Sequence, residues 1–298
     1  MGVLFAVLGM LSFASNILIT RVALKRMSID AGFPIVLAAN VVVPGLLFLV
    51  AEAERTAPFV WSWKGVGLFV IGGIVGTILG RRALFDAVKL LGAARASVFH
   101  SSAPAFAFLG AWLLAGESVA LRDMSLIAVV WVGLWLTQPP TGSRPGEELF
   151  TPEMRRRGMI AGFIAVAGFG FGNVLRGLAV RAWDEVFLGT MLSSIAALTL
   201  QVIITRDWPK VRGDWRSGGA RGIALYAASG VATGLGSIFV TYAMKNIPIG
   251  VAVLLVHTTP LVIFPVSVLI LKRREDLNPR TLGGTGLVLA GVASLLLK

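Results

Sequence analysis

The stretch GGIVGTILGRRALFDAVKLLGAARASVFHSSAP, residues 72–104, decides the fold of this chain. It begins as an apolar segment, turns near Gly92 and continues as a second apolar segment. Between and within these segments lie the polar residues Arg81, Arg82, Asp86, Lys89 and His100. A charged side chain held at the middle of a bilayer costs about 2.5 to 3.5 kcal/mol, so the arginines should face a wet or protein-lined interior. The pattern predicts two membrane helices joined by a short turn, with polar groups that need an explanation.

The whole chain has the composition of an integral membrane protein. Its 298 residues are 56% hydrophobic and 14% charged, and its mean hydropathy is +0.83. Apolar runs long enough to cross a bilayer follow one another along the chain. We interpret the first as a membrane helix rather than a signal peptide, because no positively charged region precedes it. The runs predict ten helices near 2–20, 32–51, 65–88, 96–115, 123–139, 158–180, 186–205, 221–244, 250–271 and 281–297.

The basic residues indicate topology rather than nucleic-acid binding. The net charge of +12 comes from residues in short loops, and no separate basic domain exists. Most of the 27 Lys and Arg fall in loops that follow odd-numbered helices. The positive-inside rule therefore places these loops in the cytoplasm and both termini outside. We expect a multi-pass protein of the plasma membrane, which in a bacterium would be the inner membrane.

Internal repetition organises the chain. An offset of 156 residues places Lys89 on Lys245 and Pro104 on Pro260, and an offset of 157 places Asn16 on Asn173. The glycines that match at offsets of 157 and 158 are Gly32 with Gly189 and Gly133 with Gly291. We predict a first five-helix repeat at 1–140, a linker loop at 141–157 and a second five-helix repeat at 158–298. Because five is odd, the second repeat enters the membrane in the opposite sense, which is typical of secondary transporters. The predicted fold class is an all-α integral membrane protein with ten transmembrane helices in two inverted repeats.

Two segments carry a family resemblance, DAVKLLGAARASVFHSSAP at 86–104 and TYAMKNIPIGVAVLLVHTTP at 241–260. Each is followed by an apolar helix and a charged turn, GES at 116–118 or RRED at 273–276. The chain thus resembles EamA-type members of the drug/metabolite transporter superfamily over essentially its whole length, although Arg274 stands where the family usually has Gly. The resemblance implies a substrate cavity at the repeat interface and transport of a small metabolite or drug, often as an exporter. It also implies that both termini are cytoplasmic, which conflicts with the charge count. We retain the orientation given by the charge count, with both termini outside.

Polar residues within the apolar segments are the candidate substrate-binding residues. Arginines could attract an anionic group, or could extend toward the interface, with Asp86 as the i, i+4 partner of Arg82. An intramembrane asparagine should face either a cavity or another helix, and a histidine could carry protons or merely be hydrogen-bonded. The predicted substrate-binding residues are Asn16, Arg81, Arg82, His100, Asn173, Arg176 and His257, and the predicted hinges are Pro104 and Pro260.

The sequence predicts no enzyme. It contains no phosphate-binding GxxxxGK[ST], no zinc-binding HExxH and no dinucleotide-binding GxGxxG motif. With two histidines and no cysteine, no metal site or other cofactor is expected. We predict a secondary-active exporter of amino acids or organic anions that works by alternating access around a midplane cavity between the repeats. The alternatives are a lipid-handling flippase or intramembrane enzyme, and a partner-binding membrane scaffold. The expected partners are a small-molecule substrate and membrane lipid, with no nucleic acid and with a homodimer left open.

Overall fold

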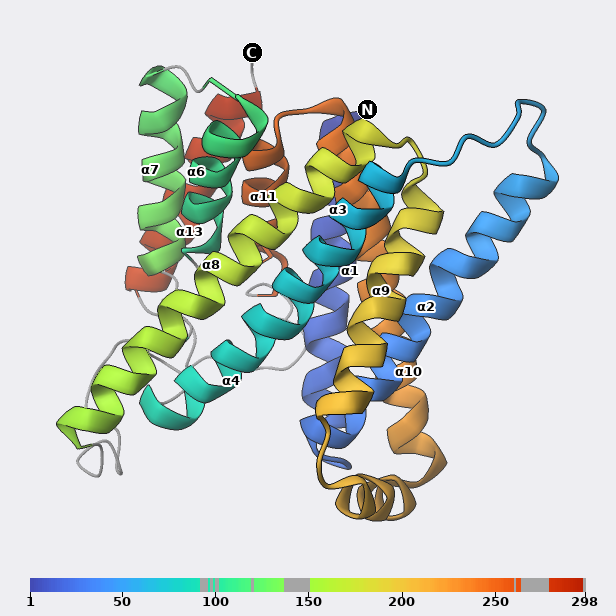
Figure 1. Ribbon diagram of the computed structural model, residues 1–298. Helices are drawn as coiled ribbons and strands as arrows, with labels where there is room; N and C mark the ends of the chain where they lie inside the picture. The colour runs from blue at the N-terminus through green and yellow to red at the C-terminus, as the bar shows by residue number, and fades with distance from the viewer. Residues whose placement is uncertain are drawn as a thin grey trace. The chain divides into compact units, whose positions relative to one another are not determined.

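A computed structural model of the chain describes residues 1–91, 96, 99, 102–118, 121–136, 151–259, 261–263 and 279–296 (Figure 1). Within these residues the chain forms helices and no strand. Two of the predicted site residues, His100 and Pro260, lie outside the described residues.

The helices follow the apolar runs of the sequence. Their bounds are α1 (Gly2–Ala23), α2 (Ile29–Ala53), α3 (Trp63–Gly73), the π-helix η1 (Ile74–Leu79), α4 (Gly80–Leu91), α6 (Ala103–Ala115), α7 (Leu121–Leu136), α8 (Pro152–Ala182), α9 (Val186–Ile204), α10 (Trp208–Asn246), α11 (Ile249–His257) and α13 (Pro279–Leu296).

Six helical segments in the described part of the chain are long and apolar enough to cross a membrane. They are Gly2–Ala23, Ile29–Ala53, Trp63–Leu91, Pro152–Ala182, Val186–Ile204 and Trp208–Asn246. Shorter apolar helices accompany them at Ala103–Ala115, Met124–Gly133, Ile249–Ile263 and Leu282–Gly291. An all-helical, multi-pass membrane protein is therefore confirmed, whereas the total of ten spans stays a prediction.

The helices group into two compact units. Unit 1 comprises Met1–Ile74 and Leu175–Ile247, and unit 2 comprises Val75–Val174 and Pro248–Lys298. Two of the three boundaries fall inside helical segments, at the start of η1 and within α8, and the third falls between α10 and α11. Each unit draws helices from both predicted repeats, so units and repeats are different divisions of the chain.

In unit 1, α1 and α2 pack against α10, and α9 packs against α2 and α3. A Cβ atom at Gly32 would lie 2.2 Å from the ring of Tyr226, and a Cβ at Gly189 would lie 2.2 Å from the ring of Phe69. Only glycine permits such approach of a ring to the backbone, and both rings are fully buried. Gly32 and Gly189 are 157 positions apart, and so are Phe69 and Tyr226. The two contacts are therefore equivalent in the two repeats.

Unit 2 contains the same kind of reciprocal contact. In the packing of α7 against α13, Gly133 faces Val288 and Gly291 faces Val130, each pair related by 158 positions. The order of these contacts shows that α7 and α13 run antiparallel, as equivalent helices of inverted repeats must. The predicted equivalence of Gly32 with Gly189 and of Gly133 with Gly291 is therefore confirmed by packing.

Candidate functional site

Asn16 lies in α1, where its amide oxygen is held by hydroxyl groups from two helices. Ser229 Oγ, on α10, donates to Asn16 Oδ1 at 2.6 Å, and Thr20 Oγ1 lies 3.2 Å from the same oxygen. Thr20 Oγ1 and Ser229 Oγ are 2.7 Å apart, which closes a triangle of oxygens. No described residue accepts a hydrogen bond from Asn16 Nδ2. The interhelical alternative is thus confirmed for the oxygen, and the two N–H groups keep their capacity to bind an acceptor.

Asn173, the repeat equivalent of Asn16, has different surroundings in α8. Its Nδ2 donates to the carbonyl of Phe169 in the same helix at 3.0 Å. No hydrogen bond from another described residue reaches its Oδ1. The turn that carries it passes close to η1, because a Cβ on Gly76 would lie 3.4 Å from the Cα of Gly172. Asn173 is therefore an acceptor on a glycine-lined helix crossing within unit 2.

Arg81 and Arg82 are neighbours on α4 but differ in exposure. The side chain of Arg81 is half-buried, whereas Arg82 and Asp86 are exposed. No ion pair joins Arg82 to Asp86, although both belong to the described residues. The i, i+4 partnership with Asp86, one of the two alternatives for Arg82, is therefore absent, and Arg82 has no charged partner within the described chain.

The π-helix η1 precedes these arginines directly. A π-helix inserts residues relative to α-helical periodicity and often occurs at functional sites. It changes which face of the following helix each residue occupies, so the position of Arg81 around the helix axis differs from that in a continuous α-helix. Nothing in the apolar sequence IVGTIL, residues 74–79, signals this irregularity.

Arg176 and His257 are both half-buried. Arg176 lies three residues after Asn173 on α8 but belongs to unit 1, whereas Asn173 and His257 belong to unit 2. His257 is the last residue of α11, and its Nδ1 donates to the carbonyl of Val253 at 2.9 Å. The histidine is therefore hydrogen-bonded within its own helix, and its part in proton coupling stays a prediction.

The helix that contains Pro104 begins close to that proline. Ser102 N donates to Phe99 O at 2.9 Å, and the equivalent Thr258 N donates to Leu255 O at 3.2 Å, 156 positions later. Pro104 then stands in the first turn of α6, where its missing N–H removes no helical hydrogen bond. The two equivalent helical segments are thus interrupted at the same place, ahead of the prolines. The hinge role of Pro104 stays a prediction, and the structure places the proline just after this interruption rather than in the interior of a helix.

Glu117, in the GES turn, has a role that sequence reasoning missed. Its Oε1 accepts from the backbone N–H of Ile249, the first residue of α11, at 2.9 Å. The preceding Gly116 ends α6 in a left-handed conformation with φ +64°, which glycine adopts readily. The motif therefore links the end of α6 to the start of α11 by a hydrogen bond. The spacing of the sequence alone does not predict this contact.

Unit 1 also buries polar atoms that have no hydrogen-bond partner among the described residues. They are Asn40 Oδ1 on α2 and the hydroxyls of Thr190 and Ser193 on α9. All three side chains are at least nine-tenths buried. A buried unpaired oxygen costs about 1 to 3 kcal/mol, so these atoms are additional acceptors for water or for a polar ligand. Nothing in the described part of the chain groups side chains suited to hold a metal ion.

Comparison with known proteins connects this arrangement to a family. The sequence model of the EamA-like transporter family matches residues 1–138 and 156–297. A solved protein crystal structure is similar over 99% of this chain and 96% of its own, with a TM-score of 0.72 and 18% sequence identity. That likeness concerns the fold alone. No curated protein gave a significant match.

Proposed function

The chain belongs to the EamA-like transporter family, and from this premise we propose that it exports small anionic metabolites, such as amino acids or organic anions, by secondary transport. The family consists of membrane transporters of small molecules. The finer statements, which concern substrate charge, direction and mechanism, are our own inference. Alternating access is the proposed mechanism, because reciprocal contacts relate the two repeats and such repeats can exchange conformations.

One observation carries the proposed substrate class, namely the orientation of the Asn16 amide. With Oδ1 occupied by Thr20 and Ser229, Asn16 can offer only N–H donors to a ligand. N–H donors within a membrane span suit a carboxylate, whose oxygens accept hydrogen bonds only. Arg81 and Arg82 supply positive charge in a separate span, which would favour the same class of substrate.

The proposed test is substrate uptake into proteoliposomes that contain the purified protein, with a panel of carboxylates, neutral amino acids and organic cations. We expect saturable transport of carboxylates. Replacement of Asn16 by Ala should lower kcat/KM for that substrate at least about tenfold, as expected for one lost hydrogen bond to a charged group. The control is Asn246→Ala, because Asn246 donates only to a carbonyl of its own helix and stands exposed at the end of α10. It should leave transport unchanged.

Other outcomes would overturn the substrate class without touching family membership. If only cations were transported, and if Arg81→Ala and Arg82→Ala left uptake unaltered, the anionic substrate would be refuted. Direction is tested separately with inside-out and right-side-out vesicles that carry the same preparation.

The proposed orientation, with both termini outside, is tested with single cysteines, because the natural chain contains none. A Lys298→Cys variant should react with a membrane-impermeant maleimide in intact cells. If labelling required broken cells, the termini would lie in the cytoplasm.

A further inference from the structure

The first part of α10 is a separate segment of helix. Helical geometry is interrupted at Gly219, where φ is 60° and ψ is −174°. This conformation is available essentially only to glycine. No atom lies within 4 Å of a Cβ built there, so the backbone rather than crowding requires the glycine. The segment 208–218 therefore turns aside from the longer remainder of α10 (Figure 1).

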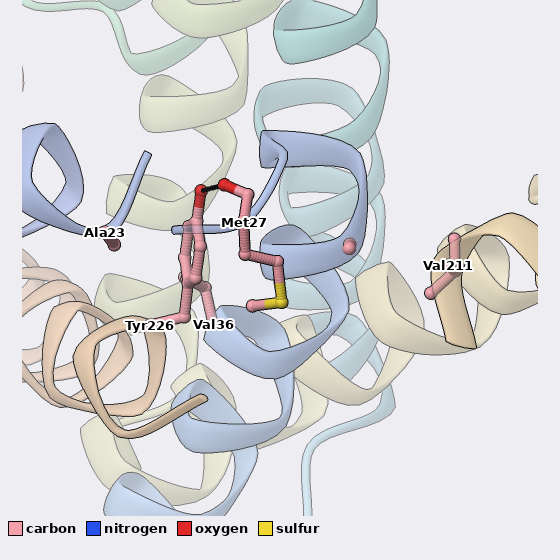
Figure 2. Packing of buried hydrophobic residues seen from close by; sticks show 6 residues of the cluster. Ala23, Met27, Val36, Val211 and Tyr226 are labelled. Carbon is pink, nitrogen blue, oxygen red and sulfur yellow. Dashed lines mark hydrogen bonds between the residues drawn. The ribbon is translucent and has the colours of Figure 1, made fainter. Parts of the chain in front are cut away.

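The apolar side of this segment is fixed to one end of unit 1. Val211 is buried in a cluster with Ala23, Met27 and Tyr226, and the Tyr226 hydroxyl donates to the carbonyl of Met27 at 3.0 Å (Figure 2). Trp215 Nε1 donates to the carbonyl of Ala31 at 2.8 Å. At this end α1 finishes, α2 begins and α9 finishes. Because these helices are membrane spans, the segment lies at the boundary between hydrocarbon and water.

The exposed side of the same end is strongly basic. Eight Lys and Arg side chains surround three Asp, and all eight are exposed. None of the eight forms an ion pair or hydrogen bond with any residue that the structure describes. Two of the aspartates are already engaged, since Asp207 caps the segment and Asp214 accepts from Ser28. The basic residues are Arg21, Lys25, Arg26, Arg206, Lys210, Arg212, Arg216 and Arg221.

The opposite end of unit 1 provides the contrast. It carries equal numbers of basic and acidic side chains, and three of the acidic ones form ion pairs. Arg55 contacts Glu185 and Glu52, each at 2.7 Å, and Lys245 contacts Asp184 at 2.6 Å. The hydrogen bond to Glu185 raises the pKa of Arg55, so the guanidinium stays charged and the Glu185 carboxylate offsets that charge. Unit 1 therefore places uncompensated positive charge at one end alone.

We propose that the basic end of unit 1 binds the headgroups of anionic phospholipids. Phosphodiester groups at this depth of the bilayer would supply the negative charge that the protein lacks, and guanidinium groups bind phosphate oxygens in pairs. Val211 and Trp215 hold the segment against unit 1, and the exposed arginines beside them therefore face the level of the headgroups. The segment 208–218 thus anchors unit 1 to one leaflet. This inference does not depend on the substrate of transport.

A fluorophore at position 217 can report lipid binding directly. Ser217→Cys is a conservative change at an exposed residue of the segment, and it creates the sole cysteine of the chain. The labelled protein in detergent micelles is titrated with phosphatidylglycerol and, separately, with phosphatidylcholine. We expect a saturable signal with phosphatidylglycerol alone. Each charge removed should weaken it about fivefold, so Arg212→Gln with Arg216→Gln should weaken it about 25-fold.

The matched control is Lys64→Gln, which removes one exposed charge from the opposite end and should change the affinity less than about twofold. Arg216→Gln alone provides a milder variant if the double replacement impairs folding. Three results would overturn the proposal: equal responses to the two lipids, full affinity in both arginine variants, or equally effective competition by soluble glycerol phosphate or an RNA oligonucleotide.

Discussion

Asn16 and Asn173 occupy equivalent positions in the two repeats and yet have different neighbours. In unit 1 the amide oxygen of Asn16 is held between α1 and α10 by Thr20 and Ser229. In unit 2 Asn173 donates to its own helix and receives nothing from another described helix. The same residue is therefore oriented by an interhelical bond in one unit and by a local bond in the other.

The difference originates in the partner positions rather than in the asparagines. An offset of 157 places Thr20 on Gly177 and Ser229 on Gly72, so both hydroxyls are replaced by glycine in the other copy. Glycine permits close approach of backbones, whereas a hydroxyl provides a hydrogen bond. Equivalent positions therefore carry glycines in one copy and hydrogen-bonding hydroxyls in the other.

The largest loss of stability is expected when a closely packed glycine of one repeat is replaced by the residue at the equivalent position of the other. Gly168→Leu gives α8 the residue that stands at the equivalent position of α1, Leu11. A Cβ at position 168 would lie 2.8 Å from the Cα of Gly80 and 3.1 Å from the carbonyl oxygen of Val75, both backbone atoms. We expect the helices to separate and the free energy of unfolding to fall by about 3 kcal/mol or more. Thermal denaturation followed by size-exclusion chromatography measures the loss.

Gly283→Leu serves as the control for this replacement. Gly283 is exposed on α13, and no atom lies within 4 Å of a Cβ built there. Its Tm should stay close to that of the natural chain. If the two leucine variants denatured at the same temperature, close packing of η1 and α4 on α8 would not be what distinguishes the second copy.

The next test removes the interhelical hydrogen bond that Asn16 accepts from Ser229. Ser229→Ala should destabilise unit 1 by about 1 kcal/mol, the usual scale of a hydrogen bond between membrane helices. In a double-mutant cycle with Asn16→Leu, the coupling energy should be about 0.6 to 1.7 kcal/mol. Thr241→Val is the control, because Thr241 is equally buried on α10 but donates only to its own helix. A coupling energy near zero would show that the contact between Ser229 and Asn16 does not stabilise unit 1.

The sequence predicted the apolar helices, the membrane class and the repeat equivalences that glycine packing confirms. It also identified Asn16, because an amide in an apolar run must find a partner. It did not identify Ser229 as that partner. A hydrophobic pattern reveals which face of a helix is buried but leaves open how far two helices slide along each other. The pairing of residues 213 positions apart depends on that register.

Other errors have local causes. The sequence predicts one helix near 96–115 with a hinge at Pro104 inside it, whereas α6 begins at Ala103 and the proline lies in its first turn. A rule for one residue type cannot separate these cases, because proline suits both a kink and a first turn. The sequence also gives no signal of the π-helix η1 or of the interruption at Gly219, because glycine is common throughout this chain.

The smallest expected change in stability comes from Asn173→Ala. The carbonyl of Phe169 keeps its place in the helix when the side-chain bond is removed, because a backbone N–H of the next turn also serves it. The free energy of unfolding should therefore fall by less than about 0.5 kcal/mol, while Asn16→Ala should cost about 1 to 2 kcal/mol because the interhelical hydrogen bond from Ser229 is lost. Both variants are compared by Tm and by substrate uptake in one preparation. A loss of uptake in Asn173→Ala without loss of stability would identify Asn173 Oδ1 as a group that binds substrate. Equal destabilisation of the two variants would mean that Asn173, like Asn16, is held by a hydrogen bond between helices.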